Sequence, residues 1–208
     1  MEVKIKDHLQ HFNNKLYMDV AGGDRVQFKD YFNAGNLMTV MHDWLVENGW
    51  ASASDAKFPE VFYHHKFMQG KIEEVRWWWR PERGPYEDHG ANFFHYEMEV
   101  DIRIVVMKKS EVMKHGMKFS TNHGDIEIKV WAKLIMDKDG KWRNHPILKN
   151  FLQLYLDRIA QKSVLRHYAF VRRDVNRFKD ALKSYFKLPV YSPEPEHQGD
   201  FGFTKDFD

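Results

Sequence analysis

Two stretches in the middle of the chain alternate apolar and polar residues with a period of two. From Asp125 to Asp137 every second residue is apolar, and Tyr96 to Met107 repeats the pattern. Because successive side chains of a β-strand point to opposite faces, this predicts two half-buried strands, which we expect to be antiparallel. Their apolar faces need a covering layer, and the long apolar helical faces of the chain lie before and after them. The sequence therefore predicts an α+β protein in which an antiparallel sheet packs against helices.

Further strands are predicted before and after Tyr96 to Met107. Val61 to Phe67 and Lys71 to Arg80 flank a short Gly-containing connection typical of a β-hairpin. A shorter strand is expected through Met117 and Phe119, followed by a turn at residues 122–124. Together these strands predict an antiparallel meander of about five strands over residues 61–137. Ala21-Gly22-Gly23-Asp24 is interpreted as a turn, because its glycines have backbone freedom.

The helices are predicted from apolar residues that recur about every 3.6 residues, the repeat of an α-helix. Leu37 to Asn48 has this spacing, with Asn36 as the expected N-cap and Gly49 just past the end. A helical pair is expected over residues 146–187. Its first helix begins at Pro146, and an unbroken apolar stripe is formed by Ile147, Leu148, Phe151, Leu152, Tyr155, Leu156 and Ile159. Its second helix runs from about Val164 to Lys187.

The composition favours one domain and argues against most common enzyme classes. The chain of 208 residues is 43% hydrophobic, which is enough for one large core, and we expect a single domain over residues 1–190. It has no Cys, which excludes thiolate chemistry and disulfides. The common nucleotide-binding, metalloprotease and serine-hydrolase motifs are missing from the sequence. We expect no cofactor, no catalytic residue and no metal site, although an unusual enzyme stays open.

No apolar run is long enough to cross a bilayer, and the N-terminus lacks the apolar core of a signal peptide. We therefore expect a cytoplasmic protein, or one that belongs to a particle assembled in the cytoplasm.

The net charge of +2 hides a strong segregation along the chain. Residues 141–190 contain 12 Lys and Arg but 3 acids, whereas residues 191–208 contain 5 acids and one Lys. Such a basic helical block attracts phosphate, in nucleic acid or in lipid head groups. The alternative, which we favour, is a solvated helix whose charges meet acidic neighbours. The candidate basic surface comprises Lys162, Arg166, Arg172, Arg173 and Arg177.

A run of three tryptophans, Trp77, Trp78 and Trp79, lies in the second arm of the hairpin. On a strand, Trp77 and Trp79 share one face and Trp78 points to the other. These rings are able to stack on unpaired nucleic-acid bases. We favour burial in a core or an interface, because each tryptophan has a large apolar area.

The last residues, 191–208, are predicted to form an extended acidic arm, with Phe201, Phe203 and Phe207 as anchors on a neighbour or on the chain itself. In style its end resembles the acidic, aromatic-tipped tails of some single-stranded-DNA-binding proteins, which shield a binding surface and recruit partners. The resemblance covers about ten residues and lacks the tip sequence of those tails. The other interpretation is a solubilising terminus.

One strand face combines His95, Glu97 and Glu99, residue types that ligate metals or transfer protons. Nothing in their spacing marks a specific site, and a polar outer face with cross-strand pairing to Lys129 and Lys133 is the simpler interpretation.

Three functional hypotheses follow. The leading one is a structural or assembly protein, a subunit of a larger homomeric or heteromeric particle, of viral or phage-like kind in one version. Its expected partners are further copies of itself or other protein subunits. The second is a nucleic-acid-binding module that uses the basic helices. The third, with least support, is an enzyme with a metal or carboxylate site.

Overall fold

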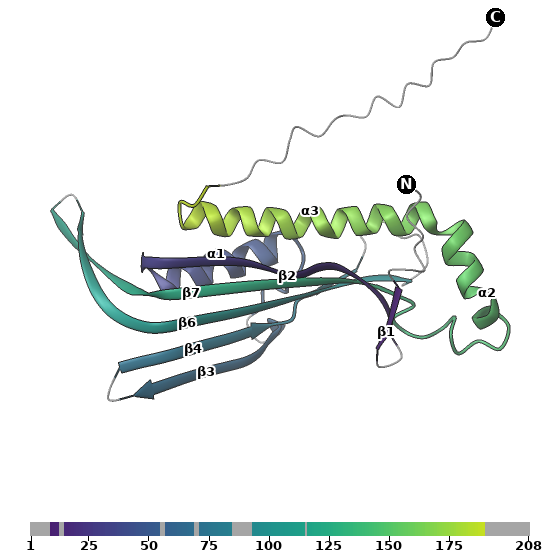
Figure 1. Ribbon diagram of the computed structural model, residues 1–208, viewed down its shortest axis with the longest axis horizontal. Helices are drawn as coiled ribbons and strands as arrows, with labels where there is room; N and C mark the ends of the chain where they lie inside the picture. The colour runs from purple at the N-terminus through teal and green to yellow at the C-terminus, as the bar shows by residue number, and fades with distance from the viewer. Residues whose placement is uncertain are drawn as a thin grey trace, which may run out of the picture.

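The computed structural model of the protein describes residues 9–12, 15–54, 57–68, 71–84, 93–114 and 116–189. These residues form an α+β structure in which helices pack against an antiparallel sheet, as predicted (Figure 1). The elements in chain order are β1 (Leu9–Phe12), β2 (Lys15–Phe32), α1 (Ala34–Glu47), β3 (Glu60–Met68), β4 (Lys71–Trp79), β5 (Glu82–Arg83), β6 (Phe94–Lys114), β7 (Met117–Met136), α2 (Leu148–Leu154), the π-helix η3 (Tyr155–Ile159) and α3 (Gln161–Tyr185).

The sheet has seven strands in the described residues, against the five predicted. Its order is β1-β2-β7-β6-β4-β3, and β5 pairs with β6. The first long strand, β2, therefore lies beside the last, β7, and β3 is the outermost strand on the opposite side. The predicted hairpin and meander correspond to β3, β4, β6 and β7, and the strands added by the structure are β1, β2 and β5.

The predicted turn at Ala21 to Asp24 is wrong, because these residues lie inside β2. The pairing of β2 with β7 shifts register between Asp19 and Ala21 and again between Gly22 and Asp24. Gly23 has φ +89°, and a Cβ added there would lie 2.8 Å from Nε1 of Trp131. The two glycines thus form a bulge over a tryptophan ring within a continuous strand.

The predicted break at residues 122–124 is also wrong, since β7 runs through it. A Cβ on Gly124 would lie 3.2 Å from the carbonyl oxygen of Val105 on β6. The register of β6 and β7 shifts between Val105 and Lys108, and Val106 has φ 53°. At this irregularity the β6–β7 hairpin bends, and its tip extends past the other strands toward the side on which α3 lies (Figure 1).

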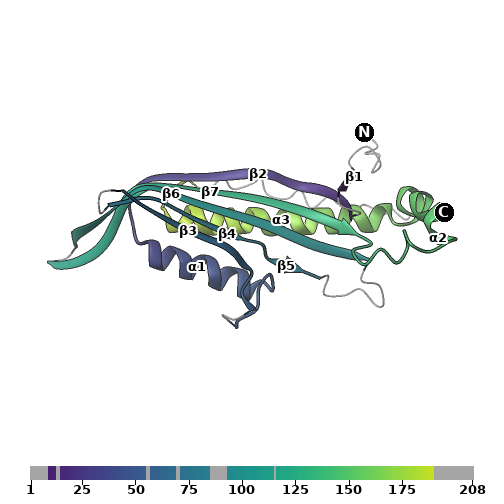
Figure 2. The same cartoon turned by 90° about the horizontal axis from the view of Figure 1, so that it is seen from below.

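Both long helices lie on the same face of the sheet (Figures 1 and 2). The faces of β6 and β7 that alternation predicted to be apolar are the buried ones, and Val100, Ile102, Ile128 and Val130 are each at most 1% exposed. Against them α3 buries one long stripe, formed by Val164, Val171, Val175, Phe178 and Leu182. The opposite, outer face of the sheet carries the charged residues of these strands.

The N-terminal helix begins earlier than predicted. The cap of α1 is Asn33, whose side-chain oxygen accepts a hydrogen bond from the backbone N–H of Asn36 at 3.0 Å. Asn36, the predicted cap, is thus the donor rather than the cap. At the other end Gly49 has φ +70° just past the helix, as the sequence predicted.

The apolar stripe predicted for the first helix of the C-terminal pair is wrong as a buried face. Leu152 and Leu156 are buried, but Ile147, Phe151 and Ile159 are 61%, 53% and 72% exposed. The π-helical turn η3, which adds a residue to each hydrogen-bonded ring, rotates Ile159 around the axis relative to the residues of α2. In addition, α2 lies beyond the end of the sheet (Figure 1), and Leu152 is its buried residue.

Candidate protein interface

The tryptophan triplet is divided between the two faces of the sheet. Trp79 is 3% exposed, and its Nε1 donates to Glu60 at 3.2 Å. Trp77 is half-buried and packs against the core. Trp78 stacks on Phe62 of β3 with ring centroids 4.2 Å apart. The structure thus brings Trp78 to the outer face and leaves Trp77 and Trp79 on the helix-bearing face.

Beside the triplet, β3 is an uncovered edge strand of nine residues. It is the last strand of the sheet in the described residues, so the backbone N–H and C=O groups on its free edge face no strand. Its exposed apolar side chains are Val61 (66%), Tyr63 (50%) and Phe67 (62%). An exposed apolar edge strand is a template for pairing with another chain, which natural proteins usually block.

Aromatic contacts order the side chains of β3 into two rows. On the helix-bearing face Tyr63 lies against Trp77 with centroids 5.3 Å apart, and His65 lies 5.7 Å from Tyr63 and 4.7 Å from Phe67. The Tyr63 hydroxyl is also 3.2 Å from Nδ1 of His65. We call Tyr63, His65 and Phe67, together with Val61 at the register shift that precedes Phe62, the inner row.

The second row lies on the outer face. Phe62 stacks between Trp78 and His64, whose ring centroid lies 6.0 Å away. We call Phe62 and His64 the outer row. Charge on β3 is sparse: Lys66 pairs with Glu73 at 2.9 Å, and Glu60 accepts from Trp79. The strand therefore presents rings on both faces and little charge to repel a neighbour.

The other end of the sheet is built differently. There β1 has four residues, less than half the length of β3. A short edge strand limits pairing with another chain. Beyond Met18 this edge is formed by β2 itself, which pairs there with β7 alone. Both sides of the sheet thus have a long edge, and the one at β3 carries Val61, Tyr63 and Phe67.

The outer face of the sheet carries a network of ion pairs. Arg80 pairs with Asp101 at 2.7 Å, and Lys133 pairs with Glu99 at 2.6 Å. Hydrogen bonds from Arg103 and Arg76 hold the pKa of Glu74 below its ordinary value. Since positive and negative side chains alternate, this face does not form a basic groove. A hollow between Trp78 and Trp131 lies within the same network of ion pairs.

The predicted basic surface is only partly a single surface. Lys162, Arg166, Arg173 and Arg177 lie on the exposed face of α3, and none forms an ion pair with another described residue. Arg172 points elsewhere, donating to the carbonyl oxygen of Val20 at 3.1 Å and lying 3.4 Å from Asp24. We call the four exposed residues the α3 basic row.

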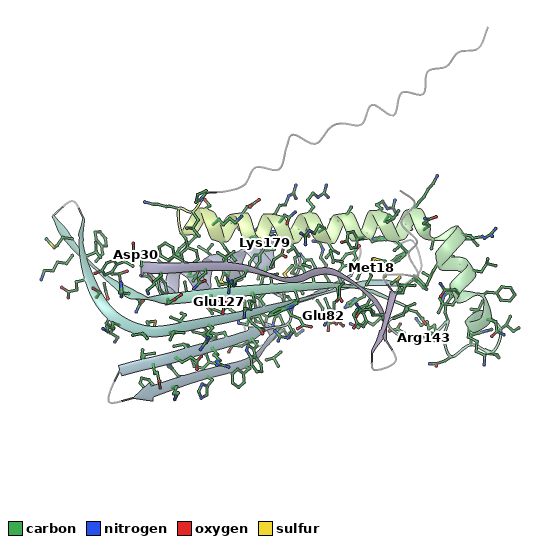
Figure 3. The ribbon with its side chains drawn as sticks, in the orientation of Figure 1. Met18, Asp30, Glu82, Glu127, Arg143 and Lys179 are labelled. Carbon is green, nitrogen blue, oxygen red and sulfur yellow. The ribbon has the colours of Figure 1, made fainter. Side chains whose placement is uncertain are left out.

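Lys179 belongs to the packing of α3 on β2 rather than to this row. It hydrogen-bonds Asp24 at 2.5 Å, and Figure 3 shows it between the two elements.

In the predicted polar group, His95 contacts two residues that the sequence did not indicate, Glu82 and Lys138. Nε2 of His95 lies 2.9 Å from Glu82 and 2.8 Å from Nζ of Lys138. Burial raises the pKa of Glu82, but the hydrogen bonds from Lys138 and His95 outweigh it and leave the pKa lowered. Glu99 is taken by Lys133, the partner that cross-strand pairing suggested. In the described part of the chain no three His, Asp or Glu side chains are grouped to hold a metal ion.

Sequence reasoning missed a buried polar cluster between α3 and the strands. Asp174, 3% exposed, accepts hydrogen bonds from Trp50 at 3.1 Å and from Arg83 at 2.9 Å. The Tyr96 hydroxyl lies 2.7 Å from Nδ1 of His167. The available signal was the position of Asp174 and His167 on the apolar stripe of α3, where a polar residue needs a buried partner.

The predicted arm and its anchors Phe201, Phe203 and Phe207 lie outside the described residues. Among the residues that the structure describes, no helix is both long and apolar enough to cross a membrane. The sequence matches no protein-family model, and no curated protein is significantly similar to it.

Proposed function

We propose that the protein is a structural subunit that associates with protein chains through the edge strand β3. The observation that carries this proposal is the exposure of Val61, Tyr63 and Phe67 on a nine-residue edge strand. Apolar side chains gain free energy when a partner removes them from water, at roughly 25 cal/mol per Å². Unsatisfied backbone groups at the same edge add hydrogen bonds that fix the partner's orientation.

The chemistry of the edge favours a protein partner over a nucleic acid. The inner row is uncharged apart from the titratable ring of His65, and the adjacent outer face has its arginines paired with carboxylates. A phosphate backbone needs unpaired cations, whereas aromatic residues with few charges are enriched at the centre of protein interfaces.

Light scattering behind a sizing column tests the proposal with the full chain and the Val61→Lys and Phe67→Lys variants. We expect a multimer for the unchanged chain and a loss of association for each variant, because a lysine at the edge blocks strand pairing. Both positions are more than half exposed, so folding of the variants, checked by circular dichroism, should be retained.

Ile159→Lys is the matched control, since Ile159, at 72%, is the most exposed large apolar residue outside the strand among those that the structure describes. A monomeric unchanged chain would overturn the proposal. So would a multimer that Ile159→Lys dissociates and the β3 variants do not, because it would place the interface at η3.

A second candidate function, nucleic-acid binding, is supported by the α3 basic row. Its four cations extend over 15 helical rises, roughly 22 Å at 1.5 Å per residue, without described acidic partners. Fluorescence anisotropy with a labelled single-stranded oligonucleotide should show an affinity that falls linearly with log salt. Arg173→Glu with Arg177→Glu should abolish it, and Lys108→Glu with Lys109→Glu on β6 should not. Binding unaffected by the α3 variant would remove this candidate.

A further inference from the structure

We propose that the strand that pairs with β3 is β3 of a second copy of this chain, antiparallel and related by a twofold axis at His64. This inference rests on the proposed function and names its partner. Two identical sheets would then continue into one another across the axis, each contributing the same edge.

The symmetry follows from the way side chains alternate. A twofold axis perpendicular to the sheet pairs identical strands antiparallel and keeps each face of one sheet continuous with the same face of the other. Residues directly opposite then share a face. The inner rows of the two copies therefore meet each other, and so do the outer rows.

The position of the axis follows from the length of the strand. His64 is the middle residue of the nine in Glu60–Met68. It is also the centre of the stretch from Phe62 to Lys66, over which β3 pairs with β4 without a register shift, so an axis there pairs this regular stretch with itself. Val61 then lies opposite the partner's Phe67, and Tyr63 lies opposite the partner's His65. This register covers Val61 and Phe67, the two most exposed apolar side chains that the structure describes on β3, with each other.

The sparse charges of the strand are compatible with this register. Lys66 lies opposite the partner's Phe62, on which its side chain is able to pack, and no Lys, Arg, Asp or Glu of the strand faces a residue of like charge. Moving the axis to Tyr63 would bring Pro59, which has no backbone N–H, opposite the partner's Phe67. Moving it to His65 would leave the first two residues of β3 without a partner inside the strand.

The absence of Cys from the sequence allows a direct test. A single cysteine on the axis faces its own copy at the 4.5 to 5.5 Å Cα separation of opposite residues, within disulfide range. We expect His64→Cys to give a disulfide-linked dimer under mild oxidation, at least ten times more than a control position, on non-reducing gels at micromolar protein.

Phe62→Cys is the matched control on the same strand and the same face. In the proposed register it is displaced by four residues from the partner's copy, roughly 13 Å at 3.3 Å per residue, beyond disulfide reach. Ile159→Cys reports random collision of exposed thiols. The His64→Cys chain should also elute as the unchanged chain does under reducing conditions.

The outcomes separate the two proposals. A multimer that Val61→Lys dissociates, with crosslinking at His64→Cys, supports both. The same multimer without that crosslink, or with stronger crosslinking at Tyr63→Cys or Phe62→Cys, overturns the twofold register and leaves the β3 interface. A monomer overturns both.

Discussion

The indole nitrogen of Trp50 donates a hydrogen bond to Oδ2 of Asp174 across 124 positions of the chain, at 3.1 Å. Arg83 donates to the same oxygen at 2.9 Å, and the side chains of this ion pair are 9% and 4% exposed. One carboxylate thus connects α3, the segment after α1 and the short strand β5. Its role is to hold the helix layer against the β3–β4 side of the sheet.

Removing this carboxylate should destabilise the protein strongly. Asp174→Ala removes the carboxylate that pairs with the buried Arg83 guanidinium, and breaking a buried ion pair costs about 3 to 5 kcal/mol. The free energy of unfolding in urea measures the loss. Asp180→Ala, on the same helix and only half-buried, should cost less than about 0.5 kcal/mol. Equal losses for the two variants would contradict the assigned role.

The two glycines of β2 should respond differently to alanine. Gly23→Ala places a Cβ 2.8 Å from Nε1 of Trp131 at φ +89°, whereas a Cβ at Gly22 meets nothing within 4 Å. Strain of this kind costs about 1 to 3 kcal/mol. Gly23→Ala should therefore lower the thermal midpoint clearly, and Gly22→Ala should leave it nearly unchanged. Similar midpoints for both variants would show that the bulge adapts.

The observed cap of α1 gives a direct comparison with the predicted one. Asn33→Ala removes the acceptor for the backbone N–H of Asn36, and the loss of such a cap costs about 0.5 to 2 kcal/mol. Asn36→Ala keeps that N–H and its acceptor and should cost less. Urea unfolding of the two variants distinguishes them, and a larger loss for Asn36→Ala would restore it as the functional cap.

The outer ion pairs predict how stability depends on acid. Hydrogen bonds from Arg103 and Arg76 lower the pKa of Glu74 in the folded chain below its ordinary value of 4.5. A lowered folded pKa contributes stability that is complete above the unfolded pKa and is lost as pH falls through the folded pKa. Glu74→Gln should therefore reduce stability at pH 7 and flatten the decline below pH 4.5. Urea titrations at several pH values measure both effects.

Glu111→Gln is the control for this experiment. Glu111 is 68% exposed and its pairing with Lys118 is long, at 3.6 Å, so the pH profile should stay unchanged. A profile for Glu74→Gln that parallels the unchanged chain would exclude Glu74 as a source of the acid dependence.

The parts of the fold that the sequence predicted are those with a local pattern. Alternation is a property of each strand alone, so the sequence was sufficient to predict which faces of β6 and β7 are buried. From the sequence, the Gly22-Gly23 pair in β2 was interpreted as a turn, because a bulge and a turn use the same backbone freedom of glycine. Only the pairing with β7 distinguishes the two, and that pairing is not local.

The candidate interface was predictable in composition but not in position. The alternation of Trp77, Trp78 and Trp79 between faces follows from strand geometry. That β3 is an edge strand follows instead from β2 closing on β7 at the other side of the sheet. Likewise the apolar stripe of α2 and η3 indicated an amphipathic helix, but not that Phe151 and Ile159 would be exposed.

The pairing of β2 with β7 also sets an order for synthesis. Arg25 and Glu127 form an ion pair between positions 102 residues apart, so β2 leaves the ribosome long before its neighbour exists. Contacts of such high sequence separation form slowly. While β7 is being translated, β2 lacks this neighbour, whereas β3 already has β4 beside it. Completion pairs β2 with β7, and in the part of the chain that the structure describes β3 keeps a strand neighbour on one side alone.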